Sequence, residues 1–292
     1  MTGVTVIMPY HRKDERVLQN LVRLRAVRHV REVLLINDGC DWEPNTLIAE
    51  LLGEETASDQ VIRLIRNERG KGVSGARNTG IIHAGQPLIC FLDYDDFIFP
   101  DRFDRDMEHF LDDDCHATVC EFDTVHEDGL TSTEKWRMPY KPGLFRNGAE
   151  FFQNSYLGVP HLTCFTYRKS TLLAQGILFD EDLRGSEDSM FKYSCVESFG
   201  FRTSPGLIGV HIMRHAHNTT SNVYSKRLLE YRLTFFWRFS SIFIKYPVAI
   251  GHFRQSYLKT LRRYLRNGGR PLLILKHAYG VARVWMGRPA GA

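Results

Sequence analysis

Short apolar runs alternate with stretches of helical spacing along the first third of the chain. Four runs rich in Val, Ile and Leu are typical of buried parallel strands, at residues 4–8, 33–36, 61–65 and 88–92. Between them the pattern predicts helices near 17–25, 44–52 and 75–84. Strand–helix alternation with short links predicts an α/β fold whose mostly parallel, Rossmann-like sheet is flanked by helices.

The second half of the chain is less regular until its end. Its pattern predicts strands at 118–125 and 162–167 and helices at 148–156 and 186–198, with Ser186 as the N-cap of the latter. Three more helices are expected near 224–245, 253–266 and 271–286, with a break at the Asn-Gly-Gly of 267–269. The α/β body is therefore followed by a C-terminal helical extension.

Polar residues stand directly after three of the predicted strands. Tyr10 and His11 follow the first, Asp38 the second, and residues 93–96 (Asp-Tyr-Asp-Asp) the fourth. In a parallel sheet, ligands bind beyond the carboxyl ends of the strands. We therefore expect these side chains to converge on one crevice.

The acidic group at 93–96 is a candidate metal site. Clustered carboxylates repel one another unless a cation compensates them, and Mg²⁺ or Mn²⁺ takes oxygen ligands. Asp93 and Asp95 are two residues apart, so in an extended segment both address one ligand. The alternative is a solvated acidic turn, which is how we interpret the Asp-Asp-Asp of 112–114 because it follows a helix.

Three familiar motifs are absent. The first strand is followed by Pro9-Tyr10-His11-Arg12 rather than by the GxGxxG of dinucleotide-binding folds. Residues 70–74 (GKGVS) lack the spacing of a phosphate-binding P-loop, and no GxSxG nucleophile elbow occurs.

Four segments in order give the chain a family resemblance. The first is the pair of strands at 4–10 (VTVIMPY) and 33–41 (VLLINDGCD), the second is 72–80 (GVSGARNTG), and the third is 93–96 (DYDD). The fourth comprises residues 168–170, 176–181 and 185–188, the last of which reads Gly-Ser-Glu-Asp. Each segment alone is weak, but in this order they resemble the family 2 glycosyltransferases of GT-A fold, over residues 4–220. The resemblance implies an inverting, metal-dependent enzyme that takes a sugar from a nucleotide diphosphate donor.

The resemblance also implies roles on the donor side. Pro9 and Tyr10 would lie against the base and ribose, and Asp38 would accept a hydrogen bond from the base. Arg77 and Lys71 would help to hold the nucleotide. The family usually has Asn where His11 stands and Ser where Cys40 stands, both beside the base-binding positions.

Further implied roles concern the metal ion. Asp93 would lie near the ribose and the ion, Asp95 would ligate the ion, and Asp96 would support that site or face the donor sugar. His217 is the best match to a histidine that such enzymes often place near the metal, with His215 as a lesser candidate. The scattered histidines are assigned to surface or core packing: His29, His83, His109, His116, His126 and His161.

Glu187 and Asp188 match the acidic pair of the family's acceptor side. By the resemblance, Asp188 would be the catalytic base and Glu187 would orient it or the acceptor. A sugar hydroxyl is a weak acid, so its attack needs a carboxylate within hydrogen-bond reach. The alternative is that both are acids placed at a helix N-terminus by the helix dipole.

Composition narrows the class of protein. The 292 residues are 43% apolar and 25% charged, which is usual for a soluble globular protein and excludes a disordered or disulfide-scaffold class. No apolar run approaches the ~18 residues of a membrane span. The six cysteines include no CxxC pair, so we expect reduced thiols in a cytoplasmic protein.

Charge is distributed unevenly. Residues 222–292 hold 14 Lys and Arg and one acid, whereas residues 1–221 hold 24 basic and 33 acidic residues. One interpretation is a set of helices packed on the body with solvated charges. The other is peripheral contact with an anionic membrane surface at its inner face, where each nearby base adds about 1 kcal/mol. No RNA-binding motif accompanies the charge, so no nucleic acid partner is expected.

We therefore predict three parts: a nucleotide-sugar-binding part (1–115), an acceptor-binding and catalytic-base part (116–221) and the basic helical extension (222–292). The predicted function is transfer of a sugar, with a UDP-sugar favoured as donor, to a glycan or lipid-linked glycan in surface polysaccharide synthesis. Two alternatives stay open, a nucleotidyltransferase and a non-catalytic module that binds nucleotides or glycans.

Overall fold

The structure is a computed structural model that describes residues 3–53, 60–126, 132–136, 144–145, 150, 160–214, 225–243, 245–270, 272, 275, 277, 282 and 286. His215 and His217 lie outside the described residues, as do most of the helices predicted at 148–156 and 271–286.

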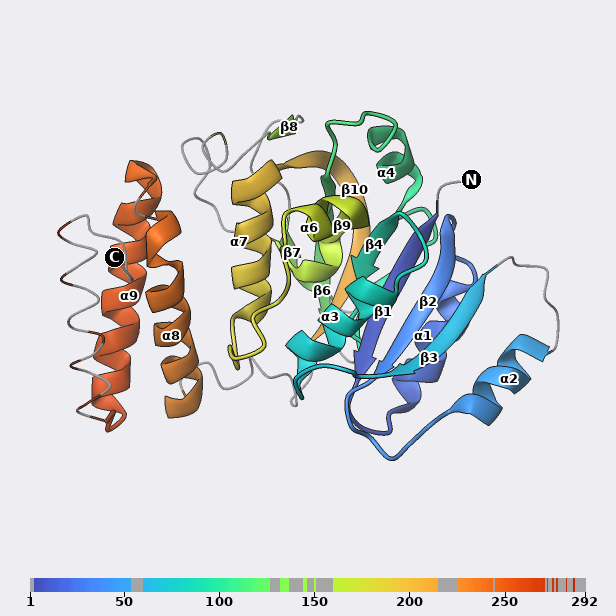
Figure 1. The fold of residues 1–292 in the computed structure, drawn as a ribbon, viewed down its shortest axis with the longest axis horizontal. Coiled ribbons are helices and arrows are strands. Elements are labelled where there is room, and N and C mark those ends of the chain that lie inside the picture. The colour runs from blue at the N-terminus through green and yellow to red at the C-terminus, as the bar shows by residue number, and fades with distance from the viewer. Residues whose placement is uncertain are drawn as a thin grey trace.

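A ten-stranded sheet runs through the body of the molecule (Figure 1). Eight strands lie in the order β3-β2-β1-β4-β9-β6-β10-β5, with β7 paired to β6 and β8 to β10. Strands β1 to β4 pair in parallel, and β9 inserts antiparallel between β4 and β6. The strands are β1 (Val4–Tyr10), β2 (Val30–Asn37), β3 (Val61–Arg66), β4 (Leu88–Phe91), β5 (Phe97–Ile98), β6 (Ala117–His126), β7 (Ser132–Trp136), β8 (Leu144–Phe145), β9 (Phe165–Arg168) and β10 (Phe201–Arg214).

Helices cover both faces of the sheet, which confirms the predicted fold class. Helices α3, α6 and α7 lie in front of the sheet in Figure 1, and α1 lies behind it. Each face has its own apolar core, one shared with α3, α6, α7 and α8 and the other with α1. The helices are α1 (Glu15–Leu24), α2 (Asn45–Gly53), α3 (Val73–His83), α4 (Asp104–His109), α6 (Lys169–Ala174), α7 (Glu187–Phe199), α8 (Lys226–Phe243), α9 (Pro247–Arg266) and the 3-10 helix η1 (Leu162–Cys164).

Strand β1 is buried on both faces of the sheet, which explains its unbroken apolar run. All seven of its residues are buried, because Val6 and Met8 face one core and Ile7 faces the other. Gly80 lets α3 approach β1 closely, since a Cβ at this position would lie 2.3 Å from Cγ2 of Ile7. The glycine in the GVSGARNTG segment thus sets how near α3 lies to the sheet.

Two parts of the sequence prediction were incomplete. The strand predicted at 162–167 is wrong in its first half, where η1 precedes β9, because three apolar residues fit either conformation. The long strand β10 was missed. Pro205, Gly206 and Gly209 interrupt its pattern, and its pairing with β6 shifts register after Ser204 and after Ile208.

The C-terminal extension packs on the body through α8. Leu229, Leu233 and Phe239 of α8 belong to the same apolar core as Phe191 and Val196 of α7. The packing interpretation therefore holds for α8. Across the described part of the chain, no helix is both long enough and apolar enough to cross a bilayer. All six cysteines are free thiols, as predicted.

A buried ion pair joins α4 to η1. Arg102 and Asp106 are fully buried, with Nη1 of Arg102 2.5 Å from Oδ2 of Asp106. Arg102 also donates through Nη2 to the carbonyl oxygen of Cys164 at 2.6 Å, and Thr166 donates to Asp106 at 2.6 Å. The pair therefore fixes η1, which follows His161 directly.

Replacing Asp106 with alanine is expected to lower the free energy of unfolding by about 3–5 kcal/mol, because it leaves the Arg102 guanidinium buried without its counter-ion. Urea unfolding followed by circular dichroism measures the change. The control is Asp104→Ala on the same helix, since Asp104 pairs with Arg28 at the surface and should cost less than about 1 kcal/mol. Equal losses in the two variants would contradict this role.

Candidate active site

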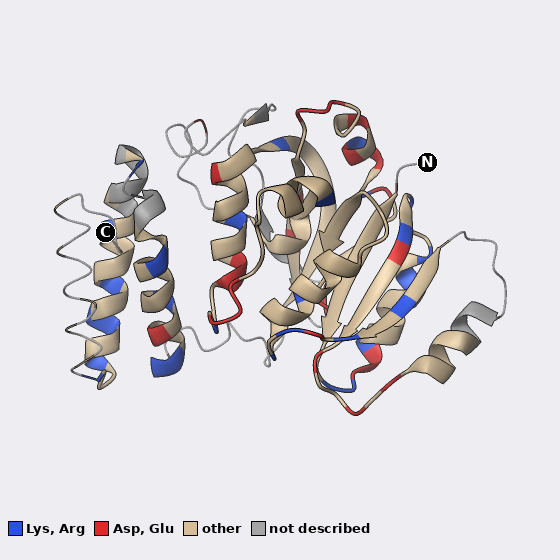
Figure 2. Cartoon of the chain, viewed as in Figure 1, with Lys and Arg blue, Asp and Glu red and all other residues tan. Residues whose placement is uncertain are grey.

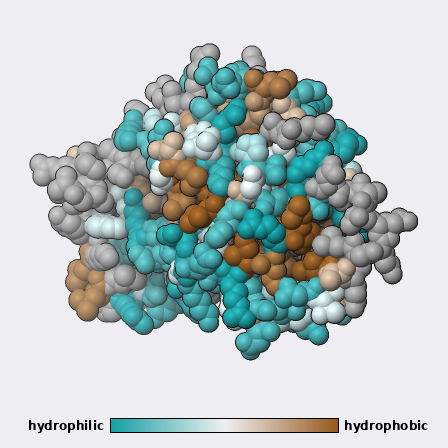
Figure 3. Space-filling view, turned by 45° about the vertical axis from the view of Figure 1, so that its right-hand side comes forward, coloured by the Kyte–Doolittle hydropathy of each residue, from teal (hydrophilic) through white to brown (hydrophobic). Residues whose placement is uncertain are grey.

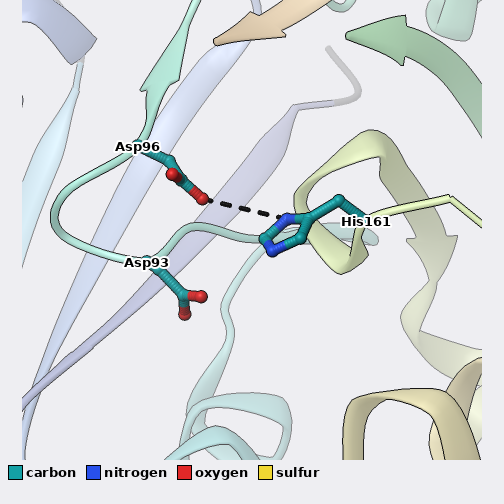
Figure 4. A group of neighbouring side chains, drawn as sticks. All are labelled: Asp93, Asp96 and His161. Carbon is teal, nitrogen blue, oxygen red and sulfur yellow. Dashed lines mark ion pairs between the residues drawn. The ribbon is translucent and has the colours of Figure 1, made fainter. Parts of the chain in front are cut away.

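The turn after β4 brings two carboxylates to the edge of the sheet. The amide of Asp96 donates to the carbonyl of Asp93 at 2.9 Å, which closes the turn. The imidazole of His161 pairs with Asp96 and lies near Asp93 (Figure 4), and one ligand atom from each of the three residues lies within 4.8 Å of the others. Nδ1 of His161 is 3.8 Å from Oδ2 of Asp96. The structure thus forms an Asp-Asp-His cluster.

His161, which the sequence pattern assigned to surface or core packing, lies in this cluster and is a further candidate metal ligand. It lies in the segment just before η1, which reaches the turn because β9 pairs with β4. No periodicity or spacing marks this histidine in the sequence. Burial lowers its pKa, so that the ring is neutral near pH 7 and can offer a lone pair to a cation.

Arg77 ties this cluster to the acidic pair at 187–188. Its Nη2 donates to Oδ1 of Asp93 at 2.8 Å and its Nη1 to Oε1 of Glu187 at 3.3 Å. The Arg77 side chain is only 5% exposed and its guanidinium also lies over the ring of Phe179. One buried cation therefore holds the ends of β4 and α7 together.

The start of α7 is fixed by an unusual backbone. Ser186 occupies the N-cap position, as predicted, but has a left-handed φ of 61° and its side chain makes no cap bond. Gly185 has a φ of 158°, and a Cβ there would lie 2.9 Å from Cδ2 of Tyr231 on α8. Such strain persists where surrounding structure enforces it, often at functional sites. Here α8 sets the position from which Glu187 and Asp188 project.

Lys192 is a second cation at the site. Its side chain is 5% exposed, and Nζ donates to Oδ2 of Asp188 at 3.0 Å and to the carbonyl of Pro160 at 2.8 Å. It therefore joins Asp188, one helical turn earlier on α7, to the residue before His161. The spacing of four residues is visible in the sequence, but the contact with Pro160 is not.

Neighbouring charges shift the pKa values of Glu187 and Asp188 in opposite directions. Burial by itself would raise the pKa of Asp188, but Lys192, His161 and Arg77 outweigh it and hold that pKa below its usual range. Burial and the neighbouring Asp188 raise the pKa of Glu187 despite Arg77. Asp188 is therefore the carboxylate that stays ionised over the wider pH range.

The donor-side residues of the prediction follow β1 and β2, at the same edge of the sheet. Pro9 and Tyr10 are buried, and the hydroxyl of Tyr10 donates to the carbonyl of Trp42 at 2.9 Å. Oδ1 of Asp38 accepts from Nδ2 of Asn67 at 2.8 Å and from the amide of Gly72 at 3.0 Å. Asp38 thus holds the start of α3, and the side chain of Lys71 beside it is exposed.

Of the two other predicted metal ligands, Asp95 and His217, the structure describes Asp95. Asp95 lies between Asp93 and Asp96 in the turn, and its charge acts on Arg16 of α1 and on Tyr94. It is not a member of the Asp-Asp-His cluster found among the described residues. The role of Asp95 as a ligand stays a prediction, as does that of His217, which lies outside those residues.

The cluster fits a divalent cation in its chemistry. Two carboxylates and a neutral imidazole suit Mn²⁺, and Mg²⁺ is also held through carboxylates. Oδ1 of Asp96 accepts from the amide of Met213 at 3.0 Å, which turns Oδ2 toward His161. The protein therefore fixes the orientation of one ligand without a metal.

The chain matches a known family of proteins. The model described as "Glycosyl transferase family 2" matches residues 5–173, which is more than half of the chain. The matched region contains the turn at 93–96, Arg77 and His161, and it ends before α7.

Curated relatives carry related names. The chain is 27% identical over 79% of its length to "Uncharacterized glycosyltransferase EpsJ" of Bacillus subtilis, covering 66% of that protein. It is 25% identical over 44% of its length to the E. coli "UDP-Glc:alpha-D-GlcNAc-diphosphoundecaprenol beta-1,3-glucosyltransferase WfgD", covering 48% of it. It is 25% identical over 68% of its length to "Succinoglycan biosynthesis protein ExoO" of Rhizobium meliloti, covering 56% of it. The chain thus spans about half to two thirds of these relatives.

Solved structures match the fold over almost the whole chain. TarS 1-349 of S. aureus in complex with UDP-GlcNAc has a TM-score of 0.65 at 15% identity, over 97% of this chain and 81% of that one. The mannosyltransferase PcManGT of Pyrobaculum calidifontis, in complex with GDP-Man and Mn²⁺, has a TM-score of 0.59 at 15% identity, with the same coverage. At this identity the likeness concerns the fold alone.

Proposed function

Because the chain belongs to glycosyl transferase family 2 and has the GT-A fold, we propose that it transfers a sugar from a nucleoside diphosphate donor to a hydroxyl of a glycan, with inversion at the anomeric carbon. The observation that carries the proposal is the Arg77 bridge, which joins Asp93 after β4 to Glu187 at the start of α7. Asp93 and Glu187, to which the proposal gives donor-side and acceptor-side roles, therefore share one cation.

In the proposed reaction, Asp188 accepts the proton of the acceptor hydroxyl. The oxygen of that hydroxyl forms a bond to the anomeric carbon, while the bond from this carbon to the diphosphate breaks on the opposite face. The nucleoside diphosphate leaves with the electron pair. Glu187, held by Arg77, orients Asp188 or the acceptor. A base positioned in this way contributes about 10²–10⁴-fold to the rate.

The donor side is proposed to use the residues after β1, β2 and β4. Pro9 and Tyr10 would lie against the base and ribose, Asp38 would bind the base, and Lys71 and Arg77 would help to hold the nucleotide. A UDP-sugar is the favoured donor, since WfgD is named for UDP-Glc and the TarS structure is a complex with UDP-GlcNAc.

A cation is proposed to sit at the donor diphosphate. Asp93, Asp96 and His161 would hold Mn²⁺ or Mg²⁺, with Asp95 and His217 as further candidate ligands. When bound, such an ion neutralises the charge that develops on the leaving phosphate. PcManGT supports this choice of ion because its structure holds Mn²⁺ beside GDP-Man.

A lipid-linked or polymeric surface glycan is the proposed acceptor. WfgD is named for a diphosphoundecaprenol-linked acceptor, and ExoO is named for polysaccharide biosynthesis. A cytoplasmic place at the inner face of the membrane would suit such an acceptor.

The test is a donor screen followed by turnover. Nucleotide sugars are added with and without Mn²⁺, and the melting temperature reports selective binding, because a ligand that binds the native state stabilises it. The selected donor is then incubated with the protein, and release of nucleoside diphosphate is measured. Binding followed by metal-dependent release supports a transferase. Binding with no release under any acceptor condition would favour a non-catalytic module.

Substituting Lys192 with methionine is expected to move the acidic limb of kcat/KM to higher pH. Without the ammonium, the pKa of Asp188 rises toward its usual range, so a larger fraction of the base is protonated at low pH. The pH profile of purified variants measures the shift. Lys245→Met is the control, since Lys245 pairs with Glu197 near the far end of α7 and is exposed. An unchanged limb in Lys192→Met would contradict this role.

A further inference from the structure

Helix α9 has two opposite faces. One face is buried against the rest of the chain. It consists of Phe253, Tyr257, Thr260 and Tyr264, which recur at intervals of four, three and four residues. The other is exposed and carries Gln255, Lys259, Arg262 and Arg266 at the same intervals. At 3.6 residues per turn these sets lie on opposite sides of the helix. Packing of the aromatic face therefore directs three cations to solvent.

The cations of α8 and α9 differ in their partners. Arg238 pairs with Asp180 of the body, and Lys245 pairs with Glu197 of α7. In the part of the chain that the structure describes, no ion pair is formed by Lys259, Arg262 or Arg266. Figure 2 shows blue predominating over red on both helices. The acidic body thus neutralises part of α8 but not the outer face of α9.

A large apolar side chain is exposed beside these cations. Leu265, on α9 next to Arg266, is 47% exposed. On the buried face of the same helix, the hydroxyl of Tyr257 lies 3.0 Å from Nδ1 of His277. Figure 3 shows hydrophobic atoms at the surface of the end of the molecule where these helices lie.

We propose that this basic face of α9, formed by Lys259, Arg262, Leu265 and Arg266, docks the protein on an anionic lipid bilayer. Cations next to an exposed leucine match an interface of acidic headgroups over acyl chains. Residues 222–292 contain one acid, Glu230, and that carboxylate accepts from the hydroxyl of Tyr264. A single-stranded nucleic acid is disfavoured, because it needs exposed aromatic rings for stacking and Phe253, Tyr257 and Tyr264 are buried.

Packed helices would connect the membrane-bound face of α9 to the candidate active site. Helix α8 lies between α9 and α7, and its Tyr231 contacts the backbone at Gly185, next to Glu187 and Asp188. Binding of α9 to a bilayer would therefore hold Glu187 and Asp188 at a fixed position relative to the lipid surface. Membrane docking goes beyond the proposed sugar transfer. It is measured without donor or acceptor, so docking and transfer can fail separately.

The test is cosedimentation of the full chain with phosphatidylcholine vesicles, with and without phosphatidylglycerol. Wild-type protein is expected to bind only the anionic vesicles, and less at high salt. The variant Lys259→Gln/Arg262→Gln/Arg266→Gln is expected to lose about 10²-fold in partitioning, since each base near the surface contributes about five-fold. Leu265→Ser should weaken binding while keeping its salt dependence.

The control removes three exposed cations from α1, α4 and the segment before α1: Lys13→Gln/Arg23→Gln/Arg105→Gln. Its net charge equals that of the α9 variant, and it is expected to bind as wild type. Circular dichroism and melting temperature check that each variant is folded. The proposal is overturned if wild type ignores phosphatidylglycerol, if both triple variants lose binding equally, or if a single-stranded RNA binds through α9 and the vesicles do not.

Discussion

Replacing Asp188 with asparagine is expected to reduce sugar transfer by about 10²–10⁴-fold while leaving donor affinity within about two-fold of wild type. Asparagine has nearly the same shape as aspartate but accepts no proton at neutral pH. The amide oxygen of asparagine can still accept a hydrogen bond from Nζ of Lys192, but the buried ammonium loses its counter-ion, so the melting temperature is measured to check the fold. The loss should therefore appear in kcat and not in the dissociation constant of the donor, measured by calorimetry.

Two variants sharpen this test. Asp182→Asn is the matched control, since Asp182 is 88% exposed and only six residues away, and its turnover should be unchanged. Glu187→Gln should weaken the link to Arg77 and give a smaller loss than Asp188→Asn. Near-normal turnover in Asp188→Asn would refute its assignment as the base, and abolition by Glu187→Gln alone would move that role to Glu187.

Replacing Asp93 with asparagine is expected to abolish metal-dependent donor binding, with a second effect on the fold. The carboxylate offers one ligand atom to the Asp-Asp-His cluster and also accepts from Arg77 at 2.8 Å. Its loss removes an anionic ligand and leaves the buried guanidinium of Arg77 paired with Glu187. Binding of Mn²⁺ in the presence of UDP or GDP is measured from the signal of the free ion in electron paramagnetic resonance.

The variant His161→Ala separates an effect on metal binding from an effect on the ion pairs of Arg77. Within the described residues, no hydrogen bond or ion pair joins His161 to Arg77. We expect weaker Mn²⁺ binding by about 10-fold or more, with melting temperature close to wild type in the absence of metal. His83→Ala is the control, since His83 pairs with Glu68 at the surface. His217→Ala is measured in parallel. If His217→Ala abolishes Mn²⁺ binding and His161→Ala does not, the described cluster is not the metal site.

The fold was largely predictable because short-range patterns dominate it. The first four strands were found from their apolar runs, since a parallel strand buried on both faces has no polar positions. The acids after β4 and the pair at 187–188 were found from their place in the order of segments. β10 and η1 were not, because a strand interrupted by proline and glycine and a single helical turn carry no clear periodicity.

The sequence alone determined the α/β fold, the family and the candidate acids at 93–96 and 187–188, because these depend on local pattern and on the order of segments. Only the tertiary structure decided which groups surround them. Arg77 meets Glu187 across 110 positions, and His161 reaches Asp96 through the antiparallel pairing of β9 with β4. Such contacts arise from the order of strands in the sheet, and no spacing along the chain encodes that order.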